Sequence, residues 1–317
     1  MMTGSVLRKG MVSTAALLLA VGLAGCGGGS SPVITPTGSD AGVSTGDSAG
    51  GATGVAVIAV QADARVDTGA GDGIDRINSV NVGPAPAISI QNVEQNPDGS
   101  VKSVTLQYGN ESPVTIGNCV VGGVVAECDG SLVLSTRDAG TSTRSSEQYQ
   151  YLQLAEWYKD YPAPNTTNGQ VTVVYGVAGE KTVNMPTQGT AIYKGTADMD
   201  IASPGDYATN FITLHANVDM TADFAQKRVS GSMHSFENPD SLEPVPVPGA
   251  VNLNGTISGN TFSAGLSGTI DSENVTGSMN GAFFGPDAGE VGGAFTLKSS
   301  SSNKVGAGVF AAKKQQP

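Results

Sequence analysis

The stretch of sequence that decides the fold is NGAFFGPDAGEVGGAFTL, residues 280–297. It reads as two short strands joined by a tight turn, in which Pro286 presets φ, Asp287 can bond its own backbone and Gly289 supplies a positive φ. Every second residue from Val291 to Leu297 then falls on one face of the second strand. Glycines inside strands suit sharp bending and close backbone approach, both of which a small closed barrel requires. The stretch therefore predicts a structural part of a barrel and not a catalytic site.

The composition favours an all-β protein of ordinary size. Of the 317 residues, 44 are glycine and only 5% are aromatic, and Val, Thr and Ser are abundant. Such a light, turn-rich chain is typical of β-structure rather than helical bundles. The formal net charge is −12. Because phosphate backbones repel an acidic chain, we expect no nucleic-acid partner.

The N-terminus has the layout of a secretory signal. Arg8 and Lys9 precede an apolar run that is too short to span a bilayer, and the sequence LAGC then ends at Cys26. This order resembles the bacterial lipobox, which implies removal of residues 1–25 and acylation of Cys26 on both sulfur and nitrogen. Several acyl chains give stable anchoring in a lipid bilayer. Gly27, by resemblance to lipoprotein sorting, implies the outer membrane. The alternative is an ordinary secretory signal with an incidental cysteine.

Two segments follow the anchor. Residues 26–52 are rich in Gly, Ser, Thr and Asp, and they predict a flexible linker. Residues 53–146 predict a small β-rich, handle-like domain, because several strand-length apolar runs are separated by turn residues. Those runs are 55–60, 74–82, 101–108 and 124–134.

Cys119 and Cys128 are the thiols that remain once Cys26 is lipidated. In an oxidising envelope we expect them to form a disulfide across a hairpin. A metal or redox pair is the weaker alternative, because the spacing is not CxxC and no histidine is near. A Gly-rich turn with Asp67 and Asp75 offers calcium-type oxygens, but a single copy without a bidentate Glu favours a plain polar turn.

Residues 147–317 predict an eight-stranded antiparallel barrel. From Ile212 to Phe224 apolar and polar residues alternate without a break, as in a long half-buried strand, and a good hairpin signal follows at 258–261. Eight or nine strands fit in this half. Closure into an up-and-down barrel with the apolar face inward removes the exposed edges.

Three motifs in this half resemble a known family. They are MPTQGTAIYKG at 185–195, GAFFGPDAGEVGGAF at 281–295 and GVFAAKK at 308–314. They look like the β-barrel domain of transferrin-binding protein B, a family that includes other surface lipoproteins of Gram-negative bacteria. The resemblance implies a non-enzymatic protein that binds its partner through variable loops. Transferrin-binding proteins themselves have two lobes, whereas this chain has room for a single barrel.

Candidate contact residues come from two places. The stiff, proline-rich segment 237–248 is exposed between strands and holds Glu237, Asp240, Leu242 and Glu243. Because proline lowers the ordering cost of binding, this segment is the first choice for partner contact. The second place is an aromatic cluster around Trp157 and Tyr158, which could form a platform, pack in the fold or belong to a short helix over 147–159.

Two histidines, His215 and His234, fall on polar faces of their strands. They could be axial haem ligands, although solvent-exposed polar residues are the commoner reading.

The sequence predicts a binding lipoprotein of the outer membrane that captures a host or environmental protein, or a metal- or haem-carrying ligand. A TonB-dependent receptor is a candidate second partner. No nucleophile elbow, zinc-protease, Walker or dinucleotide motif is present, so we expect no enzyme, cofactor or metal site. The alternatives are a structural envelope lipoprotein without a soluble ligand, and a carrier of haem or a small solute.

Overall fold

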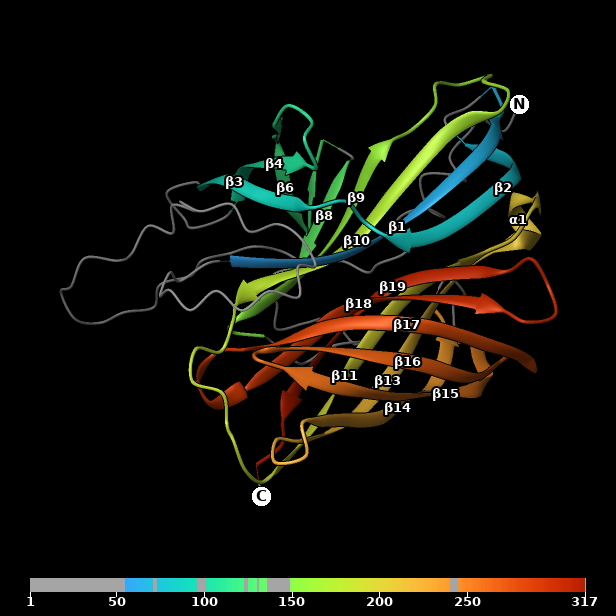
Figure 1. Ribbon diagram of the computed structural model, residues 1–317. Coiled ribbons are helices and arrows are strands. Elements are labelled where there is room, and N and C mark those ends of the chain that lie inside the picture. Colours follow the sequence, from blue (N-terminus) through green and yellow to red (C-terminus); the bar gives the residue numbers. More distant parts are fainter. Residues whose placement is uncertain are drawn as a thin grey trace.

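The computed structural model describes residues 55–70, 73–95, 101–122, 125–129, 131–135, 149–239 and 245–316. These residues form three layers: a closed barrel, an eight-stranded sheet across one side of it, and a three-stranded sheet on the other face of that larger sheet (Figure 1). Within the described ranges, no helix has the length and apolar character needed to cross a membrane.

The barrel contains eight antiparallel strands, and its closure comes from pairing between the last strand and the first. Apolar side chains at alternate positions, such as Val218, Met220 and Ala222, fill its interior. The predicted eight-stranded antiparallel barrel is therefore confirmed. In chain order the strands are β11 (Thr190–Ala202), β13 (Phe211–Asp223), β14 (Arg228–Asn238), β15 (Val245–Ser258), β16 (Thr261–Ile270), β17 (Glu273–Phe284), β18 (Glu290–Ser299) and β19 (Val305–Lys314).

The stretch 280–297 forms the β17–β18 hairpin, as predicted. Gly281 lies directly opposite Gly293, and a Cβ on Gly293 would approach the Gly281 Cα to 2.8 Å. Close approach of the two backbones thus requires glycine here. The turn itself differs from the prediction. It is a single 3₁₀ turn, η1 (Pro286–Ala288), in which Asp287 takes a φ of 53° while Gly289 has a φ of −68°.

The larger sheet combines the N-terminal strands with two strands that the sequence assigned to the barrel. Its order is β12 (Gly205–Asp206), β2 (Ile74–Pro84), β1 (Val55–Thr68), β10 (Gly169–Glu180), β9 (Leu152–Asp160), β8 (Leu132–Ser135), β7 (Val125–Cys128) and β6 (Cys119–Gly122). The predicted start of the barrel at residue 147 is therefore wrong, as is the helix over 147–159. Strand β10 is buried on both faces and pairs with β1 on one side and β9 on the other.

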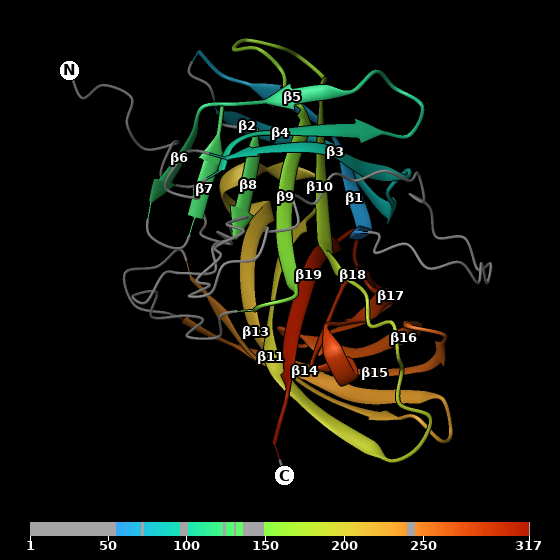
Figure 2. The same cartoon turned by 90° about the vertical axis from the view of Figure 1, so that its left-hand side faces the viewer.

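The small sheet contains β3 (Ile88–Gln95), β4 (Val101–Tyr108) and β5 (Val114–Ile116). Its strands run across those of the larger sheet (Figure 2). Between the two sheets lies a compact apolar cluster in which the Tyr108 and Trp157 rings meet edge to face at 5.5 Å. The disulfide between Cys119 and Cys128 is present and joins β6 to β7, as predicted.

The larger sheet packs its other face against the outside of the barrel. Small barrel residues, including Ala294, Ala307 and Ala311, meet Val173 and Val177 of β10 in one buried cluster. At one edge, Glu290 of β18 accepts the backbone N–H groups of Gln150 at 2.6 Å and of Tyr151 at 2.8 Å. These contacts hold the barrel against the larger sheet.

Candidate functional site

One end of the barrel is closed by aromatic side chains. The Phe283 ring lies 5.6–5.9 Å from the rings of Phe262, Phe224 and Tyr193, and all four residues are buried. The Tyr193 hydroxyl donates a hydrogen bond of 2.7 Å to the Ala288 carbonyl in η1. This end is a packed plug with its polar group satisfied.

The opposite end, which we call the mouth, opens into a cavity of about 330 Å³. It lies among the connections β11–β13, β14–β15, β16–β17 and β18–β19, on the side of the barrel where α1 (Tyr207–Asn210) sits (Figure 1). Aliphatic side chains of middling size form most of the inner wall, and among the described residues Phe211 is the one aromatic residue that lines it. The aliphatic residues include Ile201, Ile212, Leu214, Val247, Val275 and Leu297.

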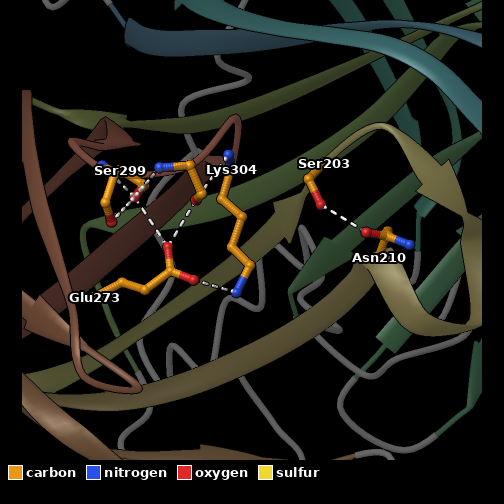
Figure 3. A network of polar contacts seen from close by, with 7 residues as sticks. Ser203, Asn210, Glu273, Ser299 and Lys304 are labelled. Atoms are coloured by element: carbon orange, nitrogen blue, oxygen red, sulfur yellow. Dashed lines mark hydrogen bonds and ion pairs between the residues drawn. The ribbon is translucent and has the colours of Figure 1, made fainter.

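A polar network borders one side of the mouth (Figure 3). The Lys304 ammonium donates to Glu273 Oε1 at 2.6 Å, and the hydroxyls of Ser299 and Ser302 donate to Glu273 Oε2 at 2.9 and 2.7 Å. These hydrogen bonds, first of all that from Lys304, lower the pKa of the Glu273 carboxyl to about 2. Glu273 is therefore an anion whose charge is balanced within the rim.

The other side of the mouth is anchored to the larger sheet. The Ser203 hydroxyl donates to Asn210 Oδ1 at 2.9 Å (Figure 3), and Asp206 accepts the Ala208 N–H at the start of α1. Asp206 also belongs to β12, which pairs with β2. This side of the rim is therefore held by hydrogen bonds.

A second polar cluster lies between the larger sheet and the barrel. Asp200 of β11 accepts hydrogen bonds from Tyr175 at 2.5 Å and from Thr213 at 2.7 Å. Glu156 of β9 faces the same cluster. Burial, with the nearby Asp200 charge as the second cause, raises the pKa of the Glu156 carboxyl to about 8. This cluster joins the two layers through two neighbouring acidic side chains, and the raised pKa of Glu156 favours its protonated form.

The predicted aromatic platform is not assembled. Trp157 and Tyr158 are neighbours in β9, so they point to opposite faces of the sheet. Trp157 is 6% exposed and packs under the small sheet, whereas Tyr158 lines a cavity of about 70 Å³ between the larger sheet and the barrel. Packing, the commoner alternative, is what the structure shows for Trp157.

The proline-rich segment is partly strand. Glu237 lies at the end of β14 opposite Pro246 of β15, so the expected exposed loop over 237–248 is shorter than predicted. A proline fits in such a strand where its missing N–H is not needed by a neighbour. Asn238 and Val247, on either side of the turn, line the mouth. Asp240, Leu242 and Glu243 lie outside the described residues, as does Cys26.

The two histidines are separated. His215 contacts Asp198 in the zone between sheet and barrel, and His234 Nε2 lies 3.5 Å from Asp219 on another part of the barrel. Neither lines the mouth cavity. Within the described ranges, no group of three or more His, Cys, Asp or Glu residues is arranged to hold a metal ion.

Sequence reasoning missed the rim residues Glu273, Ser299 and Lys304. Glu273 begins β17, whereas Ser299 and Lys304 flank the β18–β19 connection, and they meet because β17, β18 and β19 are neighbours in the barrel. The available signal was the pair of short, polar turns at 271–272 and 300–304, which a barrel topology places at the same end.

Comparison with known proteins assigns the barrel to a family. Residues 185–314 match the model for the C-lobe and N-lobe β-barrels of transferrin-binding protein B. The barrel is therefore a transferrin-binding protein B-like barrel, and the described residues form one such barrel.

The search of solved structures finds matches of low sequence identity. A transferrin-binding protein B variant from Haemophilus parasuis is 19% identical, with a TM-score of 0.43, covering 76% of this chain and 47% of that one. A variant from Actinobacillus pleuropneumoniae is 16% identical, with a TM-score of 0.38, covering 80% and 99%. A protein described as a surface lipoprotein is 14% identical, with a TM-score of 0.38, covering 80% and 98%. The chain spans about half the length of the first of these. No curated protein matches this sequence.

Proposed function

We propose that this chain is a lipid-anchored, non-catalytic binding protein of the outer membrane, and that it captures a partner protein with the mouth of its barrel. The observation that carries the proposal is the family of the barrel over residues 185–314, whose model is named for transferrin binding. A protein of the transferrin type, which carries a metal, is therefore the first partner to test. Cys26 supplies the lipid anchor, and the linker 26–52 allows the folded part to extend away from the membrane.

The mouth is the favoured contact surface for two reasons. Four connections between barrel strands gather there, and loops on a rigid scaffold are the usual place for recognition. The proline-rich segment 237–248 joins two of those strands, and it holds three acidic residues and no basic residue. A partner with a basic patch would match this charge, and its association would weaken as salt is raised.

Binding can be measured by immobilising the full chain and passing iron-loaded and iron-free transferrin-type proteins over it at low and high salt. The proposal expects saturable binding that weakens in the triple variant Glu237→Gln, Asp240→Asn, Glu243→Gln. A control that neutralises Glu94 and Glu111, two exposed carboxylates outside the barrel, should bind as the unmodified chain does.

Equal binding by the triple variant and the control would contradict the assignment to the mouth. Binding to none of these proteins, nor to any component of host fluids, with the fold intact would favour a structural envelope lipoprotein instead. Protease treatment of whole cells tests the location, because a capture protein must be cut from outside.

A further inference from the structure

We propose that the mouth cavity is a binding site for a small, uncharged amphiphile, such as a medium-chain alcohol or another molecule with an alkyl chain and a hydroxyl or amide head. This site lies inside the barrel, below the rim at which the protein–protein contact is proposed. Its occupation by a small molecule can be measured with no partner protein present.

The shape of the barrel interior supports a ligand of this kind. Eight-stranded barrels are just wide enough for side chains to fill, or for one small ligand. Here the closed end is filled by Phe283 and its aromatic neighbours, while the mouth end is lined by aliphatic side chains such as Ile212, Val247 and Leu297. The result is a cavity with an aliphatic inner wall and a polar rim.

The volume sets the size of the ligand. The cavity of about 330 Å³ is near the lower limit of ligand pockets, which span ~300–1,000 Å³. It corresponds to roughly ten water-sized volumes at ~30 Å³ each. An alkyl chain of about eight carbons with a small head is therefore the expected occupant, because burying it removes apolar surface of both ligand and wall from water.

The charges at the rim decide the nature of the head group. Two acidic residues, Asp271 and Glu273, and two basic residues, Lys298 and Lys304, line the mouth. Glu273 is already bonded to Lys304 and to two serine hydroxyls. The two acidic and two basic side chains give the rim a formal net charge of zero, so neither a carboxylate head nor a cationic head meets an excess of opposite charge. A neutral hydroxyl or amide can use the hydrogen-bonding groups of the rim without adding a charge.

The first test is a calorimetric titration of the full-length chain with a series of 1-alkanols from butanol to dodecanol. Cys26→Ser removes the predicted lipidation site and so avoids detergent. Affinity should rise about fourfold per methylene, as ~0.8 kcal/mol per buried CH₂ implies, and should stop rising near eight carbons. Saturable binding with that plateau supports a cavity of limited depth. A continuous rise to dodecanol, or no saturable binding, would overturn it.

The second test compares heads on one chain length. Octanol should bind more tightly than octanoate and octylammonium at low salt. Equal or tighter binding of either ion would overturn the assignment to an uncharged ligand.

The third test fills the cavity. Val247→Trp places an indole in the mouth and should weaken octanol binding by roughly tenfold or more. The matched control is Val183→Trp, because Val183 is 81% exposed and does not line the cavity. Unchanged binding in a folded Val247→Trp protein would contradict the location. If circular dichroism shows that this variant does not fold, the plateau of the alkanol series in the unmodified barrel decides the matter.

Discussion

The two ends of the barrel are built from the same eight strands, yet they differ in what fills them. At the closed end, aromatic rings meet around Phe283, and η1 is bonded to Tyr193. At the mouth, aliphatic side chains leave about 330 Å³ unfilled, and a balanced polar network forms the rim. The contrast shows that one end of a closed barrel can be tightly packed while the other keeps unfilled space that a ligand could enter.

The largest expected effect tests the closed end. Phe283→Ala should lower the free energy of unfolding by about 3–5 kcal/mol, because it removes a fully buried ring that contacts three others. Val247→Ala at the mouth should cost under ~1.5 kcal/mol, because its side chain already borders the cavity. Urea denaturation of both variants measures the difference. Similar losses of the free energy of unfolding in the two variants would contradict the proposed difference between the closed end and the mouth.

A second prediction uses a region outside the barrel as reference. The double variant Cys119→Ser, Cys128→Ser opens a crosslink between residues nine positions apart. The chain-entropy model gives a loss of about 2.5–3 kcal/mol for a loop of this length. Octanol affinity should stay the same, since the disulfide is in the larger sheet. A parallel loss of octanol binding at a temperature where the variant is folded would show that the mouth depends on the remote sheet.

A third prediction concerns the joint between sheet and barrel. The pKa of Glu156 is raised to about 8 from its ordinary value of 4.5, chiefly by burial and then by Asp200. The folded protein therefore retains a proton that the unfolded chain releases above its own pKa. Stability should fall as the pH rises from about 4.5 to 8, by roughly 1–3 kcal/mol.

Thermal unfolding across that pH range compares the protein with Glu156→Gln, which cannot ionise. The variant should show a flatter profile and exceed the parent at pH 8, while the two should be close at pH 4. A parent profile as flat as that of the variant would mean that Glu156 does not hold its proton in the folded state.

The smallest expected effect lies at the rim. The pKa of Glu273 is lowered to about 2, first by Lys304 and then by the two serine hydroxyls. Its contribution is therefore present above pH 4.5 and is lost as the pH falls towards 2. Since the pair is partly exposed, Glu273→Gln should cost under ~1 kcal/mol at pH 7. Differential scanning calorimetry at pH 7 and pH 3 measures it, and a larger loss at pH 3 than at pH 7 would contradict the assignment.

Local pattern was enough to predict much of the barrel. The strict alternation from Ile212 to Phe224 indicates one strand with one buried face, and the glycine-rich stretch 280–297 indicates a hairpin whose two strands approach closely. In a half-buried strand apolar residues recur at every second position, and a series of antiparallel strands has few ways to close into a barrel. The disulfide followed from elimination, because only Cys119 and Cys128 remained.

The remaining features depend on contacts between distant segments. Strand β10 lies between β1 and β9 and between two packed layers, so its sequence GQVTVVYGVAGE lacks the alternation that would have separated it from its neighbours. Trp157 and Tyr158 look like one cluster in sequence but occupy opposite faces of β9. The mouth cavity depends on how side chains fill a closed volume, which no single strand encodes.

The most direct test of the contrast is an amide chemical-shift map of the full-length Cys26→Ser chain titrated with 1-octanol. Saturable changes of the amide chemical shifts are expected at Ile212, Val247 and Leu297, and no changes are expected at Phe283 and Ala288. Shifts at the closed end, or an unchanged spectrum at saturating octanol, would contradict that contrast.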